Sequence, residues 1–172
     1  MPGIGDPRFE RAAIAMCAHD AEGALGIGVD RVVTGIGLHG LLTQFEIDTD
    51  GVPDAPLHLG GPIEPRRGFV LHSTDWGGAD TVDVAGRWGL TTTVDVLKAI
   101  ANGTGPRRWL VALGYAGWGE GQLEGELTRH GWFNTAGSEQ LLFDHPAEAR
   151  WEAAFAQAGI DPRLLSSQTG RA

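Results

Sequence analysis

Glycine residues interrupt the apolar segments of this chain at short intervals, and this limits the possible folds more than any other feature. The chain has 27 glycines among 172 residues, about twice the usual glycine content. They follow no three-residue period, which excludes a collagen helix. Most stand at the ends of apolar runs, where a residue without Cβ permits tight turns and close approach of two backbones. The sequence therefore predicts short strands and helices joined by tight turns.

Most apolar segments have the length and composition of strands, and several occur in neighbouring pairs. Residues 12–19 and 24–29 are separated by a short polar turn and are predicted to form a hairpin, as are residues 81–84 and 88–91. We also expect strands at residues 57–59, 68–72 and 108–113, and helices that start near Thr34, Val94, Gln122 and Pro146. Paired strands interrupted by single helices differ from the strict alternation of a doubly wound fold, so an α+β fold with a mixed sheet is favoured.

The chain length suits one domain, which we expect to comprise residues 1–172. Its last segment, residues 166–172, is small and polar, and we expect it to be frayed.

The charge of the chain argues against direct binding to nucleic acid. There are 22 acidic and 13 basic residues, with a net charge of −9, whereas proteins bind DNA largely by neutralising phosphates with Lys and Arg. The tight basic pairs, Arg66-Arg67 and Arg107-Arg108, are flanked by Pro or Gly and are interpreted as turn residues. Direct nucleic-acid binding is therefore disfavoured.

The cellular compartment is predicted from the cysteine and apolar content. A single cysteine, Cys17, cannot form an internal disulfide, which fits a reducing compartment. No apolar run approaches the length that spans a bilayer, and the N-terminus lacks the pattern of a signal peptide. We therefore expect a cytoplasmic protein that does not associate with a membrane.

The segment from Gly114 to Gly121 joins the strongest predicted strand to a predicted helix, and it is the leading candidate for a functional loop. The free N–H groups and the dipole at such a junction attract anions. However, the segment lacks the Gly-Lys-Ser/Thr ending of a phosphate-binding loop, and Glu120 adds negative charge. Alternatively, its glycines let Tyr115 and Trp118 pack closely against neighbouring strands. Both interpretations stay open.

Other motifs of the chain are interpreted as structural. Gly35 to Gly40 match G-x-G-x-x-G, but they stand too far from the preceding strand and lack the following βαβ units, so the match is attributed to chance. Ser73-Thr74-Asp75 is interpreted as a turn.

The thiol and imidazole groups do not predict a metal or catalytic site. Cys17 and His19 are two residues apart in a predicted strand, so we expect their side chains on the same face. With His72 they could form a Cys–His pair or a metal site, but zinc usually needs three or four protein ligands. We expect a buried thiol beside a hydrogen-bonded histidine. No metal, cofactor or catalytic residue is predicted.

Several separate segments together resemble the bacterial YqgE/AlgH family, and the resemblance covers essentially the whole chain. Its most specific part is the block GYAGWGEGQLEGEL at residues 114–127. The other matching segments are residues 1–2 with 6–9, 17–19 with 23–26, 60–63, 69–72, and 142–144 with 150–151 and 159–161. The chain departs from the family pattern at Glu120, where proline is usual, at His58, where an aromatic residue is usual, and at residues 30–32. Because the family's chains normally begin with a short apolar segment before Met-Pro, we expect a shortened start here.

The resemblance implies an α+β fold in which a bifurcated mixed sheet curls into a pseudo-barrel with flanking helices. It implies little about function, since members are described as uncharacterised proteins or as candidate transcriptional regulators associated with alginate control. We expect a non-enzymatic protein that acts through an unknown protein or small-molecule partner. The alternative is a protein that binds a small molecule, a nucleotide or another anion, including a hydrolase, and that uses residues 114–122. The predicted contact residues are Gly60, Gly61, His72, Gly114, Tyr115, Gly117, Trp118, Gly119 and Gln122.

Overall fold

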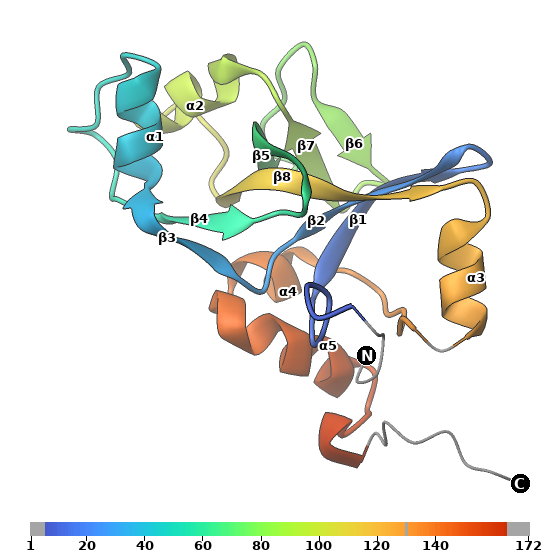
Figure 1. Ribbon diagram of the computed structural model, residues 1–172. Coiled ribbons are helices and arrows are strands. Elements are labelled where there is room, and N and C mark those ends of the chain that lie inside the picture. The colour runs from blue at the N-terminus through green and yellow to red at the C-terminus, as the bar shows by residue number, and fades with distance from the viewer. Residues whose placement is uncertain (1–5, 130, 165–172) are drawn as a thin grey trace, which may run out of the picture.

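An eight-stranded mixed sheet forms the centre of the molecule and curls until it is nearly closed into a barrel (Figure 1). The computed structural model describes residues 6–129 and 131–164. The strands are β1 (Ile14–Asp20), β2 (Gly23–Gly28), β3 (Val32–Gly37), β4 (Pro56–Leu59), β5 (Ile63–His72), β6 (Val82–Val84), β7 (Trp88–Thr91) and β8 (Trp109–Gly119). The helices are α1 (Leu38–Gln44), α2 (Val94–Ala101), α3 (Gln122–Thr128), α4 (Glu139–Phe143) and α5 (Arg150–Gln157), with short 3₁₀ helices at Ala147–Ala149 and Pro162–Leu164. The predicted α+β class is confirmed, and so are the hairpins β1–β2 and β6–β7.

Strand β8 is the branch point of the sheet. One of its edges pairs with β5 in antiparallel fashion. Its other edge pairs in parallel with β4 at residues 111–113, and then in antiparallel fashion with β2 at residues 116–119. The sheet therefore splits along β8, as the predicted bifurcated sheet requires.

The glycines at this branch allow backbones to approach one another closely. Gly114 has a φ of +74° and lies between the part of β8 that pairs with β4 and the part that pairs with β2. A Cβ atom on Gly60, which follows β4, would overlap the carbonyl oxygen of Gly114. A side chain cannot be accommodated at such a backbone crossing. The structure thus gives an architectural role to glycines that the sequence placed in a contact surface.

Alternating side chains of the central strands build a hydrophobic cluster on each face of the sheet. Phe69 and Leu71 of β5 lie in one cluster, together with Leu142 of α4. Val70, between them in sequence, lies in the other cluster, which includes Val96 of α2. Helices α1 and α2 therefore cover one face of the sheet, whereas α4 and α5 lie on the opposite side (Figure 1). This is the period-two pattern of a strand buried on both faces.

Two predictions of local structure are wrong. The helix expected to begin near Thr34 begins at Leu38, because residues 32–37 form strand β3, which pairs with β4. The β-branched residues of this segment favour a strand, and the apolar period of the following helix had been extended too far back. The pair Arg66-Arg67 lies within strand β5, not in a turn, because this strand begins five residues earlier than predicted, at Ile63. The sequence also did not predict helix α4.

The predicted helices at Val94 and Gln122 begin where expected. The helix predicted from Pro146 starts as a 3₁₀ turn and becomes α-helical at Arg150. The frayed tail predicted at residues 166–172 lies outside the described residues. In the part of the chain that the structure describes, no helix has the length and hydropathy needed to cross a membrane.

Candidate functional site

The segment 114–119 is not a loop but the second half of strand β8, which runs unbroken from Trp109 to Gly119. The alternation of glycine with larger residues suits a strand that pairs closely with β2, where Gly117 lies opposite Leu25. The sequence analysis took the glycines as a loop signal, because glycine usually weakens a strand. The strand ends in a two-residue turn before α3.

The start of α3 offers little to an anion. The helix has seven residues, and the side-chain oxygen of Gln122 accepts a hydrogen bond from the N–H of Gly119 at 3.1 Å. The side-chain amide of Gln122 in turn donates to Glu126 at 2.9 Å. Gln122 therefore serves to hold the turn together.

Trp118 is buried and belongs to a polar–aromatic cluster. Its indole N–H donates to Oε2 of Glu126 at 2.9 Å, and the indole of Trp132 donates to the same oxygen at 2.6 Å. The two indole rings meet edge to face with centroids 5.8 Å apart. Burial raises the pKa of Glu126, but hydrogen bonds from Gln122, Trp132 and Trp118 outweigh that effect, so the pKa is lowered. Glu126 is therefore the ionised anchor of both indoles.

Tyr115 and His72 do not lie in a common cleft with Trp118. Tyr115 packs edge to face on Phe69, with ring centroids 5.6 Å apart. His72 is fully buried at the end of β5. Its Nε2 lies 2.9 Å from Oγ1 of Thr91, and its Nδ1 lies 2.9 Å from the carbonyl oxygen of Ser73.

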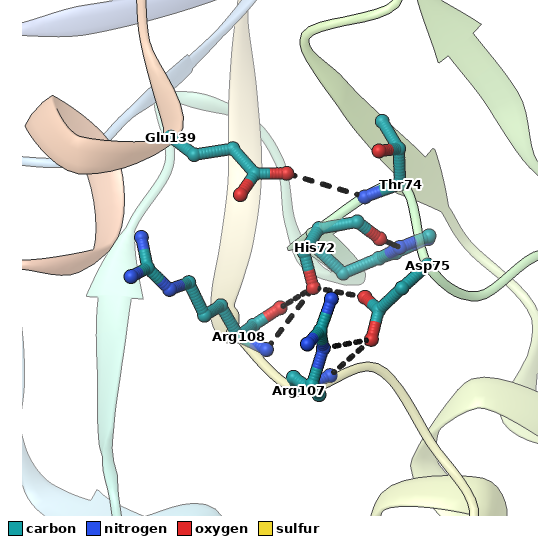
Figure 2. Close-up of polar contacts among 7 residues, drawn as sticks. His72, Thr74, Asp75, Arg107, Arg108 and Glu139 are labelled. Atoms are coloured by element: carbon teal, nitrogen blue, oxygen red, sulfur yellow. Dashed lines mark hydrogen bonds and ion pairs between the residues drawn. The ribbon is translucent and has the colours of Figure 1, made fainter.

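The turn that follows His72 forms a polar brace with the residues that precede β8. Figure 2 shows Asp75 facing Arg107, whose Nε donates to Oδ2 of Asp75 at 2.8 Å. The hydroxyl of Ser73 donates to the other oxygen of Asp75 and accepts from the N–H of Arg108 at 3.1 Å. Hydrogen bonds from Ser73 and Arg107 lower the pKa of Asp75 against the effect of burial. Because His72 contacts the carbonyl and not the hydroxyl of Ser73, the two do not form a nucleophile–base pair.

The prediction that Cys17 and His19 point to the same face of the strand is wrong. A β-bulge between Met16 and Ala18 interrupts the pairing of β1 with β2, so Cys17 and His19 do not share a face. Cys17 points into the core, and burial raises the pKa of its thiol to about 12, against a smaller opposite effect of Trp88. His19 is exposed and lies 2.5 Å from Glu124 of α3. The described residues contain no group of three His, Cys, Asp or Glu side chains arranged to hold a metal.

A cavity of about 320 Å³ lies between β1, α3, α5 and the segment that precedes α4. Its walls are mainly aromatic and aliphatic. The large apolar side chains in this wall are Ile14, Met16, Trp88, Trp118, Leu123, Leu127, Trp132, Phe133, Leu141, Leu142, Trp151 and Phe155. Cavities of this size and character are typical sites for small molecules. Of the predicted contact residues, only Trp118 lines this cavity; ligand contact by the others stays a prediction.

One histidine and two arginines are the basic side chains that line the cavity. They are His19, Arg87 and Arg150, and no carboxylate is found among the described lining residues. The arginines in this wall have the opposite sign of charge to the chain as a whole, whose net charge is −9. The basic side chains in the cavity wall thus include two arginines, whereas the carboxylates of Glu124 and Glu126 lie behind the lining residues His19, Trp118 and Trp132.

Arg150, the first residue of α5, is buried at 6% exposure. Its Nη1 donates to the carbonyl oxygen of Val29 at 2.5 Å and to Nε2 of His58 at 2.7 Å. Nδ1 of His58 lies 3.2 Å from the carbonyl oxygen of Val111, to which it donates. Burial, together with the charge of Arg150, lowers the pKa of His58 to about 4. His58 is therefore neutral at pH 7, with its proton on Nδ1.

Sequence reasoning did not select Arg150 or the cavity. Nothing in the local sequence around Arg150 distinguishes it from a solvated arginine at the start of a helix. The unusual histidine at position 58 was a signal in the sequence. Its relation to Arg150 is visible only in the structure, where β4 and α5 meet.

Comparison with known proteins identifies the relatives of the chain. A protein-family model described as AlgH-like matches residues 1–163. A UPF0301 protein of Rhizorhabdus wittichii is 66% identical over the whole chain and 92% of its own length. A UPF0301 protein of Sphingopyxis alaskensis is 56% identical over the same shares.

Two solved structures share the fold. The solution structure of the AlgH protein from Pseudomonas aeruginosa matches with a TM-score of 0.78 and 38% identity, covering all of this chain and 92% of the other. A crystal structure of a Corynebacterium diphtheriae protein matches with a TM-score of 0.70 over 88% of this chain and 80% of the other. At 17% identity, the second match shows the fold alone.

Proposed function

This chain belongs to the AlgH-like family, and on that premise we propose that it is a binding protein that acts by holding a small molecule with an apolar body in its aromatic cavity, not by catalysis. The observation that carries this proposal is the cavity of about 320 Å³ between β1, α3 and α5. Its volume lies in the range of small-ligand sites, and its walls combine aromatic surface with few polar groups. A regulatory role would then depend on the ligand that is bound.

The cavity is bordered by elements that a ligand could reposition. Helix α3 is tied to the sheet mainly through Leu123, the Trp118–Glu126 hydrogen bond and the exposed His19–Glu124 pair. A ligand in contact with Trp118 and Leu123 would therefore act on the orientation of α3. This gives ligand binding a route to an outer surface where a partner protein could detect it.

The state of the chemically reactive groups favours binding over catalysis. The thiol of Cys17 is buried and protonated, with its pKa raised to about 12, whereas nucleophilic cysteines have lowered pKa values. His72 is enclosed by Thr91 and the backbone. Neither is placed as an activated nucleophile or general base beside the cavity.

Direct contact with DNA remains disfavoured on the grounds of charge. A DNA-binding face needs clustered Lys and Arg side chains. Arg8, Arg67, Arg107, Arg108 and Arg163 each form an ion pair with a carboxylate. A regulator of this kind would act through a protein partner.

The test is a ligand titration in which the cavity is filled by mutation. Ala154 lines the cavity from α5, whereas Ala156 on the same helix is exposed. Calorimetric titration with 2-naphthylacetate and its neutral amide should show binding to the wild-type protein and to the matched control Ala156→Trp. Ala154→Trp should lose it. If neither compound binds the wild-type protein, or if both tryptophan variants bind alike, the cavity is not a ligand site.

A further inference from the structure

The guanidinium of Arg150 is a buried cation that has no carboxylate in direct ion-pair contact among the described residues. Glu148 and the largely buried Asp30 act on its charge without such a contact. Asp30 is instead bonded to Arg31 at 3.3 Å and to the N–H of Ala13 at 3.0 Å. An unpaired charge in a low-dielectric environment is costly, and such charges are normally paired.

The hydrogen bonds of Arg150 use one end of its guanidinium. Both known contacts, to Val29 and to His58, come from Nη1. Its Nε is buried and has no hydrogen-bond partner among the described residues. Nε–H and one N–H of Nη2 point in parallel along the side of the guanidinium, which is the fork that binds the two oxygens of a carboxylate.

The surroundings of this fork suit an anion with an apolar body. Arg150 lines the aromatic cavity, with Trp151 and Phe155 of the same helix in the same wall. Arg87 also lines it, and no described lining residue carries a negative charge. Burial lowers the pKa of Arg150 more than Glu148 and Asp30 raise it, so these carboxylates compensate its charge only in part. Arginine nevertheless stays protonated in proteins.

We propose that Arg150 binds a carboxylate group, and that the cavity takes a small monocarboxylate with an aromatic or aliphatic body. The carboxylate would lie on the Nε–Nη2 edge, where the side chains that cover Nε must move aside on binding, and would supply a direct counter-ion, while the apolar body would occupy the space between Trp118 and Trp151. A phosphate monoester carries nearly two charges and three acceptor oxygens, and it suits sites with more donors than one arginine edge supplies. This inference rests on the proposed function, since it names the ligand class of the same cavity.

The first test compares ligands on the unmodified protein, so that it does not depend on the folding of a variant. Calorimetric titration should show 2-naphthylacetate binding roughly ten- to a hundredfold more tightly than 2-naphthylacetamide, as expected for losing a charge-assisted hydrogen bond. Equal affinities would leave the cavity a ligand site and overturn the carboxylate assignment. Tighter binding of 2-naphthyl phosphate than of the carboxylate would also overturn it. Failure of all these compounds to bind would reject the proposed function itself.

The second test locates the carboxylate on the guanidinium. In nitrogen-15-labelled protein, the Nε–H resonance of Arg150, identified by its loss in Arg150→Lys, should shift downfield as 2-naphthylacetate is added. Arg150→Lys keeps a positive charge but loses the fork, and it should weaken binding about tenfold. Arg107→Lys is the matched control, at an exposed arginine outside the cavity lining, and it should bind normally. A stationary Nε–H resonance under saturating 2-naphthylacetate would overturn the assignment.

Discussion

Arg150 determines the protonation state of His58 across the junction of α5 and β4. Nη1 of Arg150 lies 2.7 Å from Nε2 of His58, and a guanidinium can only donate, so Nε2 must be the unprotonated nitrogen. The opposite nitrogen then donates to Val111. A protonated imidazole would place two cations in contact in a buried environment. This contact makes the junction sensitive to acid.

The first prediction is a loss of stability in mild acid that depends on His58. Its pKa is about 4 in the folded protein and about 6.5 in the unfolded chain. Between these values the unfolded chain binds more protons, so stability is fully present above pH 6.5 and falls as the pH decreases toward 4. The full effect is about 3 kcal/mol at most.

Urea unfolding between pH 4 and pH 7.5 measures this effect. His58→Gln retains an acceptor for Arg150 and a donor for Val111 but does not titrate. Since burial also raises the pKa of Asp30, the informative quantity is the difference in unfolding free energy between the two proteins. Parallel stability curves for the wild type and His58→Gln would contradict the prediction.

A second prediction concerns the branch of the sheet. Gly60→Ala should lower the free energy of unfolding by about 2 kcal/mol or more, because the new Cβ would overlap the carbonyl oxygen of Gly114. Gly119→Ala is the control, since a Cβ there meets nothing within 4 Å. Denaturant unfolding of both variants decides the point. Equal losses would mean that the close approach at the branch is not a stability determinant.

A third prediction concerns the carboxylate shared by Trp118 and Trp132. Glu126→Ala should destabilise the protein by about 1–2 kcal/mol, because it removes the acceptor of both indole N–H groups at a half-buried position. Glu124→Ala is the control. It removes a carboxylate two residues earlier on the same helix, and the partner of that carboxylate, His19, is exposed. Its effect should be about 1 kcal/mol or less. Fluorescence-monitored urea unfolding should separate the two variants, and a reversed order would contradict the assignment.

A fourth prediction concerns the single thiol. Because the pKa of Cys17 is raised from 9.0 to about 12, its thiolate fraction at neutral pH is lower by a factor of about 10³ than that of an exposed cysteine. Iodoacetamide should therefore modify the native protein at least about 10³ times more slowly than the urea-unfolded chain. Mass spectrometry follows the reaction. Rapid labelling of the native protein would indicate an activated cysteine and would weaken the non-catalytic proposal.

The sequence predicted the fold more completely than the candidate site. Apolar runs and turns located most strands, and the family resemblance supplied the bifurcated sheet. The spacing of apolar residues did not separate β3 from α1. Leu38, Leu41 and Leu42 follow a helical pattern, and only the glycine at position 37 marks where the helix begins. In the same way, the glycines of β8 resembled a loop because their pairing partners, such as Leu25, are distant in sequence.

The cavity was beyond the reach of sequence reasoning for a physical reason. Its walls come from β1, α3 and α5, and no single segment carries enough of them to form a motif. The sequence likewise does not show that Arg150 lacks an ion pair among the described residues, because its neighbour Glu148 acts on its charge without direct contact. A charge without a partner can be recognised only once all its neighbours are known.

The central position of strand β8 also affects how the molecule unfolds. Because β8 is hydrogen-bonded to β2, β4 and β5, detachment of β2 or β4 leaves most of its ladder with β5 in place. Amides in the middle of β8 should therefore exchange with solvent deuterium only when the whole chain unfolds. Their exchange rates would report global stability, while those of β1 and β3, each at the outer edge of its branch, would report local opening.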